Sequence, residues 1–453
     1  MTAVLLVGLA LVPLASAGTP GLPAWGTEPS PNVGVLNGLS VRTATDIWAV
    51  GHSPGLEYNS RTLHYDGTAW TLVPSPNLED GVRLEDVVAI AADDAWAVGW
   101  ARNPSSFDDR NVAMHWDGTA WTIVPTPQPG DQFGDRLLAV DAVASNDVWA
   151  VGVFDAEYPA TSNRSLILHW DGTAWTIVRR GGPIVHKLAP RPCDTYGGLA
   201  GIAVVSPTDI WAVGDATTCH FDGTAWSEVP SPQPEYPELA YPLEDVSAVS
   251  SDDVWAVGAR IIETPFSVAW GGLAEHWNGQ QWTRVRALGD ATSLLGVEAV
   301  ASNDVWAVGR NDYGPRILHY AGSSWTDVAT PEWGRAGRLA GVDSSGPNDL
   351  WAVGDYQLGT LIEHAPSATQ GAVVGDTNVS FATVSWFGPE NGSTQTNLFG
   401  EYEVGGLTAG TYTFTATEPG CTPDSRTVAV VAGQTREENF LIGCPRPRGR
   451  QAD

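Results

Sequence analysis

The sequence of 453 residues contains 50 glycines, 32 prolines and 21 tryptophans, and 43% of it is hydrophobic. This composition indicates a globular chain rich in turns, as an all-β fold needs, and the length allows one large domain plus a small one. The net charge of −29 repels phosphate backbones and anionic lipids, which argues against a nucleic-acid partner or a membrane partner.

The chain opens with an apolar run from Val4 to Leu14, followed by the small residues Ala15-Ser16-Ala17-Gly18. This pattern predicts a secretory signal peptide over residues 1–17, with a cleavage site of the Ala-x-Ala type. The run is too short for a stable membrane anchor, and no other apolar run approaches 18 residues. We therefore expect a secreted, extracellular protein.

Two short elements then recur along the chain. The first, Asp46-Ile47-Trp48-Ala49-Val50-Gly51, appears seven times, with its tryptophan at Trp48, Trp96, Trp149, Trp211, Trp255, Trp306 and Trp351. The second contains His-aromatic-Asp-Gly in its best copies and ends at Trp70, Trp121, Trp175, Trp226, Trp282 and Trp325. Its Asp-Gly pair predicts a two-residue hairpin turn that pairs Tyr65 with Thr68 and places Leu63 opposite Trp70 and His64 opposite Ala69.

The seventh copy stops at His364-Ala365-Pro366 without a closing tryptophan, whereas Trp25 near the N-terminus has no repeat before it. Each repeat offers four strand signals, and periods near 50 residues are typical of radial blades. The sequence therefore predicts an all-β fold: a seven-bladed β-propeller over residues 18–367, closed by an N-terminal strand, plus a small C-terminal β-sandwich. Closure removes the exposed sheet edges that an open array would leave.

This architecture resembles the WD-type and kelch-type propellers, in which both termini complete one blade, although the Gly-His and Trp-Asp pair of the WD family is absent. The chain is also similar to exported Trp-rich propellers of actinobacteria. One class of these, the dispase autolysis-inducing proteins, implies a protease as partner.

Beyond Pro366-Ser367 the pattern changes. The segments Gly371-Ala372-Val373-Val374-Gly375 and Gly400-Glu401-Tyr402, with Gly406-Leu407-Thr408-Ala409-Gly410-Thr411-Tyr412, resemble the carboxypeptidase regulatory-like module. The resemblance implies a prealbumin-like sandwich, related to Cna-B domains and grouped with carbohydrate-binding-like folds, over residues 368–444. Such modules are mostly spacers or stabilising accessories, with sugar binding as the alternative. Residues 445–453 are expected to form a disordered tail.

Four cysteines in an exported chain favour two disulfides. Of the three possible connectivities, we predict the pairing of neighbours within each domain: Cys193 with Cys219, and Cys421 with Cys444. No cysteine and histidine set has zinc-ligand spacing, so no metal and no cofactor are expected.

Loop length distinguishes the two ends of the propeller. The first and third turns of each repeat are nearly uniform, whereas the second turns and the crossovers between blades vary strongly in length. Variable loops on a rigid repeat array are a common place for binding. The longest crossover brings together the basic residues Arg179, Arg180, His186, Lys187 and Arg191, which suit an acidic partner unless they are only a solvated loop.

Six aromatic residues in or beside these variable loops are candidates for stacking on sugars or for anchoring a protein partner: Trp100, Trp270, Trp333, Tyr158, Tyr236 and Tyr241. Seven histidines occupy one position per blade, and a hydrogen bond to the backbone or to a turn carboxylate is expected for each: His64, His115, His169, His220, His276, His319 and His364. Acids on the innermost strands suggest, weakly, a cation in the central channel: Asp86, Asp141, Asp245, Glu298 and Asp343.

No catalytic residue is predicted, because the sequence contains no Gly-x-Ser-x-Gly, no His-Glu-x-x-His and no phosphate-binding loop. We expect a monomeric, non-catalytic binding protein whose variable-loop face holds an extracellular protein or glycan. A lectin that stacks sugars on Trp100, Trp270 or Trp333 is the first alternative. A glycoside hydrolase on the same scaffold, which needs an acid and a base in a loop-face cleft, is the second.

Overall fold

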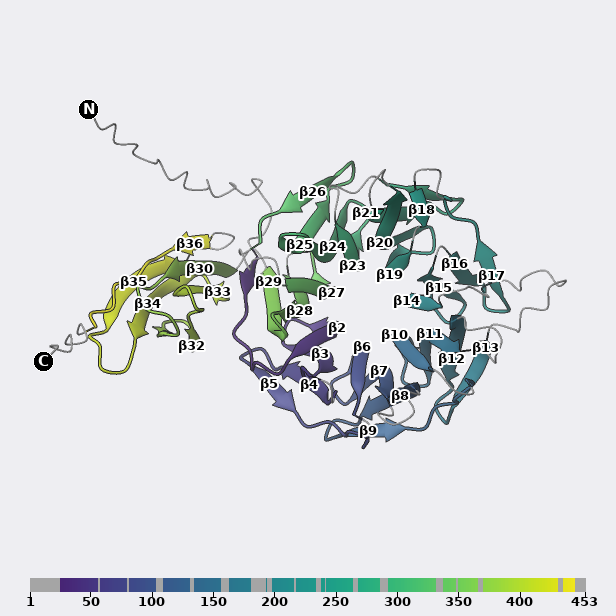
Figure 1. Ribbon diagram of the computed structural model, residues 1–453, viewed down its shortest axis with the longest axis horizontal. Helices are drawn as coiled ribbons and strands as arrows, with labels where there is room; N and C mark the ends of the chain where they lie inside the picture. The colour runs from purple at the N-terminus through teal and green to yellow at the C-terminus, as the bar shows by residue number, and fades with distance from the viewer. Residues whose placement is uncertain are drawn as a thin grey trace, which may run out of the picture.

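The computed structural model describes residues 25–444, except for 56–57, 80, 103–108, 131–133, 156–162, 181–192, 194–197, 216, 234–237, 241, 264–267, 286–291, 331–336, 348, 366–369 and 431–434. Every regular element in these ranges is a β-strand, and no helix there is long and apolar enough to cross a membrane. Seven antiparallel sheets stand as blades around a central channel, with a smaller two-sheet domain at one side of the ring (Figure 1).

Blades 1 to 6 each contain four consecutive strands that pair in chain order from the channel outwards. Blades 1 to 3 comprise β2 (Val35–Thr43), β3 (Asp46–His52), β4 (Ser60–Tyr65), β5 (Trp70–Val73), β6 (Arg83–Ala91), β7 (Asp94–Arg102), β8 (Asp109–Trp116), β9 (Trp121–Val124), β10 (Arg136–Ala144), β11 (Asp147–Asp155), β12 (Asn163–Trp170) and β13 (Trp175–Arg180). Blades 4 to 6 comprise β14 (Leu199–Ser206), β15 (Asp209–Gly214), β16 (Thr217–Phe221), β17 (Trp226–Val229), β19 (Leu243–Ser250), β20 (Asp253–Glu263), β21 (Val268–Trp277), β22 (Trp282–Arg284), β23 (Ser293–Ala301), β24 (Asp304–Asn311), β25 (Gly314–Tyr320) and β26 (Trp325–Val328). Blade 5 gains a fifth strand, β18 (Glu238–Ala240), which pairs with the far end of β20.

Blade 7 closes the ring as the sequence predicts. Its strands β27 (Gly337–Gly346), β28 (Asp349–Tyr356) and β29 (Gly359–Ala365) are completed by β1 (Gly26–Thr27), which pairs Gly26 with His364. Trp25 is buried there, with its ring 5.7 Å from that of Trp306. The N-terminal segment therefore fills the place that the missing seventh tryptophan leaves empty.

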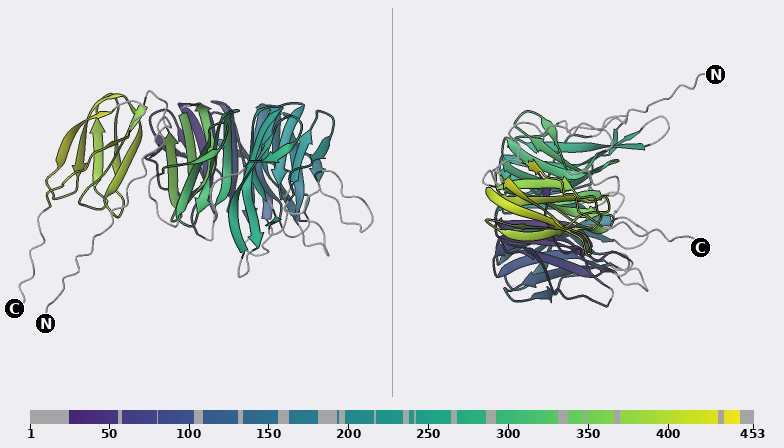
Figure 2. Two further views of the ribbon diagram at one scale, coloured as in Figure 1. Left: turned by 90° about the horizontal axis from the view of Figure 1, so that it is seen from above. Right: turned by 90° about the vertical axis from the view of Figure 1, so that its left-hand side faces the viewer.

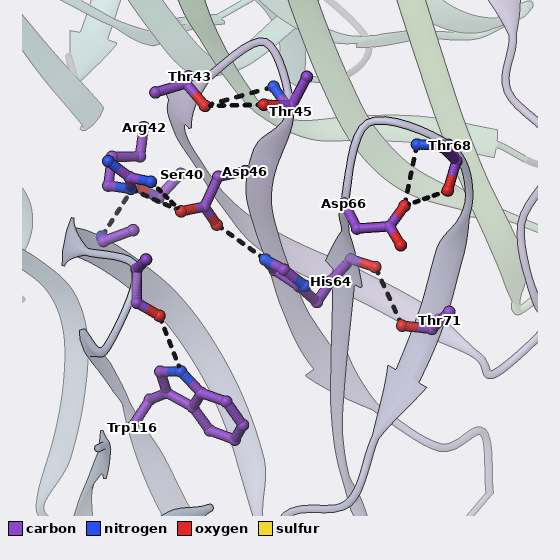
Figure 3. A network of polar contacts seen from close by, with 12 residues as sticks. Ser40, Arg42, Thr43, Thr45, Asp46, His64, Asp66, Thr68, Thr71 and Trp116 are labelled. Atoms are coloured by element: carbon purple, nitrogen blue, oxygen red, sulfur yellow. Dashed lines mark hydrogen bonds and ion pairs between the residues drawn. The ribbon is translucent and has the colours of Figure 1, made fainter. Parts of the chain in front are cut away.

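The hairpin register differs from the prediction. Tyr65 pairs with Trp70 and His64 with Thr71, so the turn has four residues and the prediction of a two-residue turn is wrong. The cause is the Asp66 side chain, whose Oδ1 accepts hydrogen bonds from the Thr68 amide and the Thr68 hydroxyl (Figure 3), and also from the Ala69 amide. These bonds hold the pKa of Asp66 below its usual value. Gly67 supplies the positive φ of 89° that the turn needs.

The repeated histidines join the two repeated elements within each blade. Each Nε2 lies 2.7–2.9 Å from the aspartate two residues before the repeat tryptophan, as the structural role predicted for them requires. Each imidazole also packs on that tryptophan, at 4.6 Å between the rings of His115 and Trp96. The histidines are therefore structural residues, half-buried in blades 1 to 5 and buried in blades 6 and 7.

His115→Ala is expected to lower the free energy of unfolding by about 2 kcal/mol, because it removes a charge-assisted bond to Asp94 and a ring contact with Trp96. Urea denaturation measures this loss. Thr122→Ala, on the exposed residue opposite His115, is the control and should stay within about 0.5 kcal/mol of the native protein. A double-mutant cycle with Asp94→Ala that shows no coupling would contradict the assigned contact.

Both predicted disulfides are present, Cys193–Cys219 in the propeller and Cys421–Cys444 in the C-terminal domain. That domain has two facing sheets with a shared core that contains Tyr412 and Phe414. One sheet has the order β33-β30-β36 and the other β32-β31-β34-β35. The strands are β30 (Gln370–Asp376), β31 (Thr383–Phe387), β32 (Asn391–Gln395), β33 (Glu401–Thr408), β34 (Gly410–Thr417), β35 (Asp424–Val430) and β36 (Thr435–Glu437).

Candidate functional site

The first and third turns of a blade meet at one end of the propeller. In blade 1, His64 binds Asp46 from the first turn, and Gly67 of the third turn packs against Thr45. Antiparallel pairing places the second turns and the blade crossovers at the opposite end, which we call the loop face. The long strands β20 and β21 of blade 5 extend towards this face beyond their neighbours (Figure 2).

A β-bulge at the same place in every innermost strand shapes the channel at the loop face. The ladder register shifts between Leu84 and Asp86 in β6, and at the matching position in the other six blades. A bulge leaves one residue outside the ladder and turns its side chain to a new direction. All seven bulge residues line one pocket of about 370 Å³, the channel mouth: Asn37, Glu85, Leu138, Ala200, Glu244, Leu295 and Ala340.

Arginines surround Trp100 at this mouth. The guanidinium carbons of Arg83, Arg102 and Arg136 lie 5.8, 5.0 and 4.8 Å from the centre of the indole ring, within the range of cation–π attraction. The indole Nε1 donates a hydrogen bond to Glu85 at 2.7 Å. Trp100 is only 5% exposed, so it is not the solvent-facing stacking residue that the lectin hypothesis needs.

The arginines at and beside the mouth are held in place by buried or half-buried acids, and Arg83 is paired with Glu85 at 2.6 Å. Asp109 binds Arg102 and Arg136 at once, with Nε to carboxylate oxygen distances of 2.9 and 2.5 Å. Arg338 reaches the Asp355 carboxylate and the Asn37 side chain, each at 3.0 Å. Because Asp109 is shared by two guanidinium groups, these arginines of blades 2, 3 and 7 outnumber the acids paired with them by one.

These charges and the burial of the mouth shift the pKa of nearby groups. Burial, together with the positive charges of Arg83 and Arg338, lowers the pKa of His52 to about 4, against a hydrogen bond with the Ser53 carbonyl that raises it. Glu244 belongs to β19, on the opposite side of the ring from β6 (Figure 1). Burial and the charge of Asp215 raise the pKa of Glu244. The mouth therefore combines a basic arc with an acidic residue opposite it.

Exposed apolar side chains extend the loop face over blades 5 to 7. Trp270, on β21, is 48% exposed, which is the position that the sequence assigned to a stacking or anchoring residue. The short second turns of blades 6 and 7 add Tyr313 and Leu358, which are 72% and 58% exposed. Sequence reasoning missed these two. Their signal was a large apolar residue at the tip of a tight turn, where polar residues are usual.

The structure describes few of the other predicted binding residues. Arg179 lies on β13 and is partly exposed, whereas only the backbone of Arg180 is described. The remaining candidates lie outside the described residues: His186, Lys187, Arg191, Trp333, Tyr158, Tyr236 and Tyr241.

The predicted channel acids do line the channel, deeper than the mouth, around a pocket of about 240 Å³. Asp86, Asp141, Asp245 and Asp343 each accept a backbone amide from the next blade, and the Asp343 bond to Val41 at 2.6 Å joins blade 7 to blade 1. Burial raises the pKa of Asp86 to about 8, that of Asp245 to about 7 and that of Asp141 to about 6. Within the described ranges, no cluster of three or more acidic, histidine or cysteine side chains is arranged to hold a metal ion. The geometry therefore gives these acids a structural role.

Comparison with known proteins adds a domain match and a fold. Residues 368–442 match the carboxypeptidase regulatory-like domain. None of the curated proteins matches this chain. YCF48 from Cyanidioschyzon merolae shares 16% identity with a TM-score of 0.50, covering 76% of this chain and 99% of its own. A structure of YCF48 bound to D1 peptide shares 14% identity with a TM-score of 0.49, covering 77% of this chain and 99% of its own. The GH74 xyloglucanase from Xanthomonas campestris shares 13% identity with a TM-score of 0.50, covering 91% of this chain and 68% of its own. At such identities the likeness concerns the fold alone.

Proposed function

We propose that this chain, a seven-bladed β-propeller followed by a carboxypeptidase regulatory-like domain, is a secreted, non-catalytic protein that binds an extracellular protein through its loop face. The observation that carries the proposal is the coincidence on one face of the variable loops, the arginine-lined channel mouth and the exposed Trp270, Tyr313 and Leu358. Buried aromatic and arginine anchors dominate the energy of most protein interfaces, which is the chemistry this face offers.

Two further features support an extracellular location and a monomeric state. Disulfides persist in oxidising compartments, so the two bridges fit an extracellular location. Ring closure pairs the outer edge of β29 with β1, and a closed ring has less need of a second copy to cover its sheet edges. We therefore propose that the protein acts as a monomer, with an extracellular protease as the first partner to test.

The loop face can be tested by capture of culture-medium proteins on the immobilised full chain. Trp270→Ser with Tyr313→Ser is expected to weaken the binding of the captured protein at least about 30-fold, since an interface hot spot is worth about 2 kcal/mol or more. Leu72→Ser is the matched control, because Leu72 is 50% exposed but lies on β5 at the outside of blade 1. Equal capture by all three proteins, or no capture by the native chain, would refute the proposal.

A glycan-acting protein is the second candidate, and one observation favours it. Glu85 and Glu244 face one pocket from opposite sides of the ring; Glu85 accepts a hydrogen bond from Trp100, whereas burial raises the pKa of Glu244. Two carboxyls in unlike environments are what a glycoside hydrolase uses as acid and base. Activity on a panel of plant and cell-wall glycans that Glu244→Gln abolishes would establish this alternative. Binding to the same glycans without turnover, lost in Trp270→Ser, would instead establish a lectin.

A further inference from the structure

The C-terminal sandwich exposes large apolar side chains at one of its ends. Four of them, from three different loops, are between 58% and 74% exposed: Phe381, Leu398, Phe399 and Leu441. The loops lie where β30 ends and β33 begins, next to the ladder pair of Asp376 and Glu401. We call this end of the sandwich, residues 376–382, 396–401 and 438–444, the apolar tip. Large apolar groups gathered on one exposed surface are typical of an interaction site.

Hydrogen bonds join the three loops of the apolar tip into one surface. The Ser380 hydroxyl donates to the Leu398 carbonyl at 2.6 Å. On the other side of the same loop, Asn378 donates to the Ile442 carbonyl at 2.9 Å and accepts from the Ile442 amide at 2.6 Å. The disulfide of this domain fastens the end of the third loop. The apolar side chains are therefore presented on a cross-linked set of loops.

The backbone of Phe381 is strained in a way that keeps its ring in solvent. Its φ is 57°, in the left-handed region that bulky residues rarely adopt. The side chain is 58% exposed, so packing in the core does not compensate for this conformation. Hydrogen bonds to the neighbouring loop hold it instead, from the Phe381 amide to the Asn397 carbonyl at 3.3 Å and from the Ala382 amide to the Thr396 hydroxyl at 2.9 Å. Strain of this kind is concentrated at functional sites.

The apolar tip has an acidic rim. A fourth loop, residues 418–424, lies beside the third one through the bridge between Thr422 and Gly443. Together the four loops contain five acids and no lysine or arginine: Asp376, Glu401, Glu418, Asp424 and Glu438. Arg426, which lies on β35 outside these loops, pairs with Asp424 at 3.1 Å and with Glu438 at 3.5 Å. The acids therefore outnumber the cation that pairs with them.

This charge decides between the occupants that an apolar surface can take. A second copy of the chain would bring the same acids face to face, and an anionic membrane would repel a molecule with a net charge of −29. A protein segment that carries apolar side chains among lysines or arginines complements both the centre and the rim. Residues 445–453, which follow Cys444, contain three arginines but no large apolar side chain, so they match the rim alone.

We propose that the apolar tip of the C-terminal domain docks a cationic, amphipathic segment of another protein. The four exposed apolar side chains contact the apolar face of that segment, and the acids around them face its lysines or arginines. The site belongs to the sandwich and does not depend on the function proposed for the loop face.

Fluorescence anisotropy with the full chain can test this site. The probe is a labelled peptide of about 18 leucines and lysines, patterned as an amphipathic helix. Leu398→Ser with Phe399→Ser is expected to weaken its binding at least about 10-fold, because both anchors are lost. Phe387→Ser is the matched control. Phe387 is 72% exposed on the same domain but lies at the other end of β31, where it pairs with Asn391, so this variant should bind as the native chain does.

The contribution of charge is tested with the same peptide. Asp376→Asn with Glu418→Gln should weaken binding about 3-fold, as expected for exposed ion pairs. The peptide with glutamate in place of every lysine should not bind. A chain that ends at Cys444 should bind at least as tightly as the native chain, because it lacks three arginines that repel the peptide.

Several results would overturn the proposal. No binding by the native chain, or equal binding by the native chain and the double serine variant, would show that the apolar tip does not hold the peptide. Binding to phosphatidylcholine vesicles, or self-association in sedimentation, that the double serine variant abolishes would identify a lipid surface or a second copy as the occupant instead.

Discussion

Gly309→Ala is expected to lower the free energy of unfolding by about 3 kcal/mol or more, although it adds a single methyl group. A Cβ atom at Gly309 would lie 2.0 Å from the Ser293 carbonyl oxygen and 2.9 Å from the Leu294 Cα atom. Both atoms belong to the backbone of β23, where the bulge brings the chain towards β24. The backbone cannot move aside as a flexible side chain could, so the ladder must shift. The same contact explains the glycine that ends each Trp-Ala-Val-Gly element.

Chemical denaturation of Gly309→Ala against Gly341→Ala measures this effect. Gly341 also lies on an innermost strand, but a Cβ atom there would meet its nearest neighbour, the Asn37 carbonyl oxygen, at 3.4 Å. The control should therefore remain within about 1 kcal/mol of the native protein. Similar losses in the two variants would show that chain flexibility, and not the close approach at the bulge, is the reason for glycine.

Trp25→Ala should cost about 4 kcal/mol, as truncation of a buried tryptophan usually does, and should open the ring. Trp25 anchors a strand of two residues, Gly26–Thr27. Next to this strand, the Glu28 amide donates a hydrogen bond to the Ile362 carbonyl of blade 7 at 2.9 Å. Without the indole, little apolar area keeps this segment in place. Hydrogen exchange should then rise at Glu28 and along β29, together with the lower denaturation midpoint.

Trp175→Ala is the matched comparison for that experiment. Trp175 is as buried as Trp25 and occupies the equivalent place in blade 3, with its ring 5.3 Å from that of Trp96. Its strand β13 is joined to β12 through a tight turn, so it loses packing without leaving the sheet. We expect Trp175→Ala to lose as much stability as Trp25→Ala, with the rise in hydrogen exchange confined to blade 3. The same exchange pattern in both variants would argue against a seam at blade 7.

The repeat made the architecture readable from the sequence. Seven copies of one tryptophan motif fixed the number of blades, and the unmatched Trp25 and His364 indicated how the ring closes. Both disulfides followed from cysteine placement. The hairpin register did not, because Asp-Gly suits a two-residue turn and a four-residue turn equally well. The Asp66 carboxylate decides between them by accepting three hydrogen bonds within the turn.

The candidate site was harder to predict because it depends on the ring and on the bulges. Arg83, Arg136 and Arg338 are far apart in the sequence and meet only after seven blades have come together. A bulge adds one residue to a strand, and nothing in the residue types announces it. Trp100 stood out as a tryptophan outside the repeat, but of the arginines that cover it only Arg102 is a neighbour in sequence, and Arg83 and Arg136 come from other strands.

The seam has a consequence for how a nascent chain reaches this fold. His364 binds Glu28 across 336 positions, so the segment around Glu28 is synthesised long before its partner and must wait for the last blade. Blades built from neighbouring hairpins can assemble locally, whereas the final contact pays the full entropy of a very long loop. Until then Trp25 stays unshielded and β29 keeps an open edge, the kind of edge through which β-proteins aggregate. The ring is therefore completed in a single late folding step. Chains that have not reached this step can be recognised by their open edge at β29.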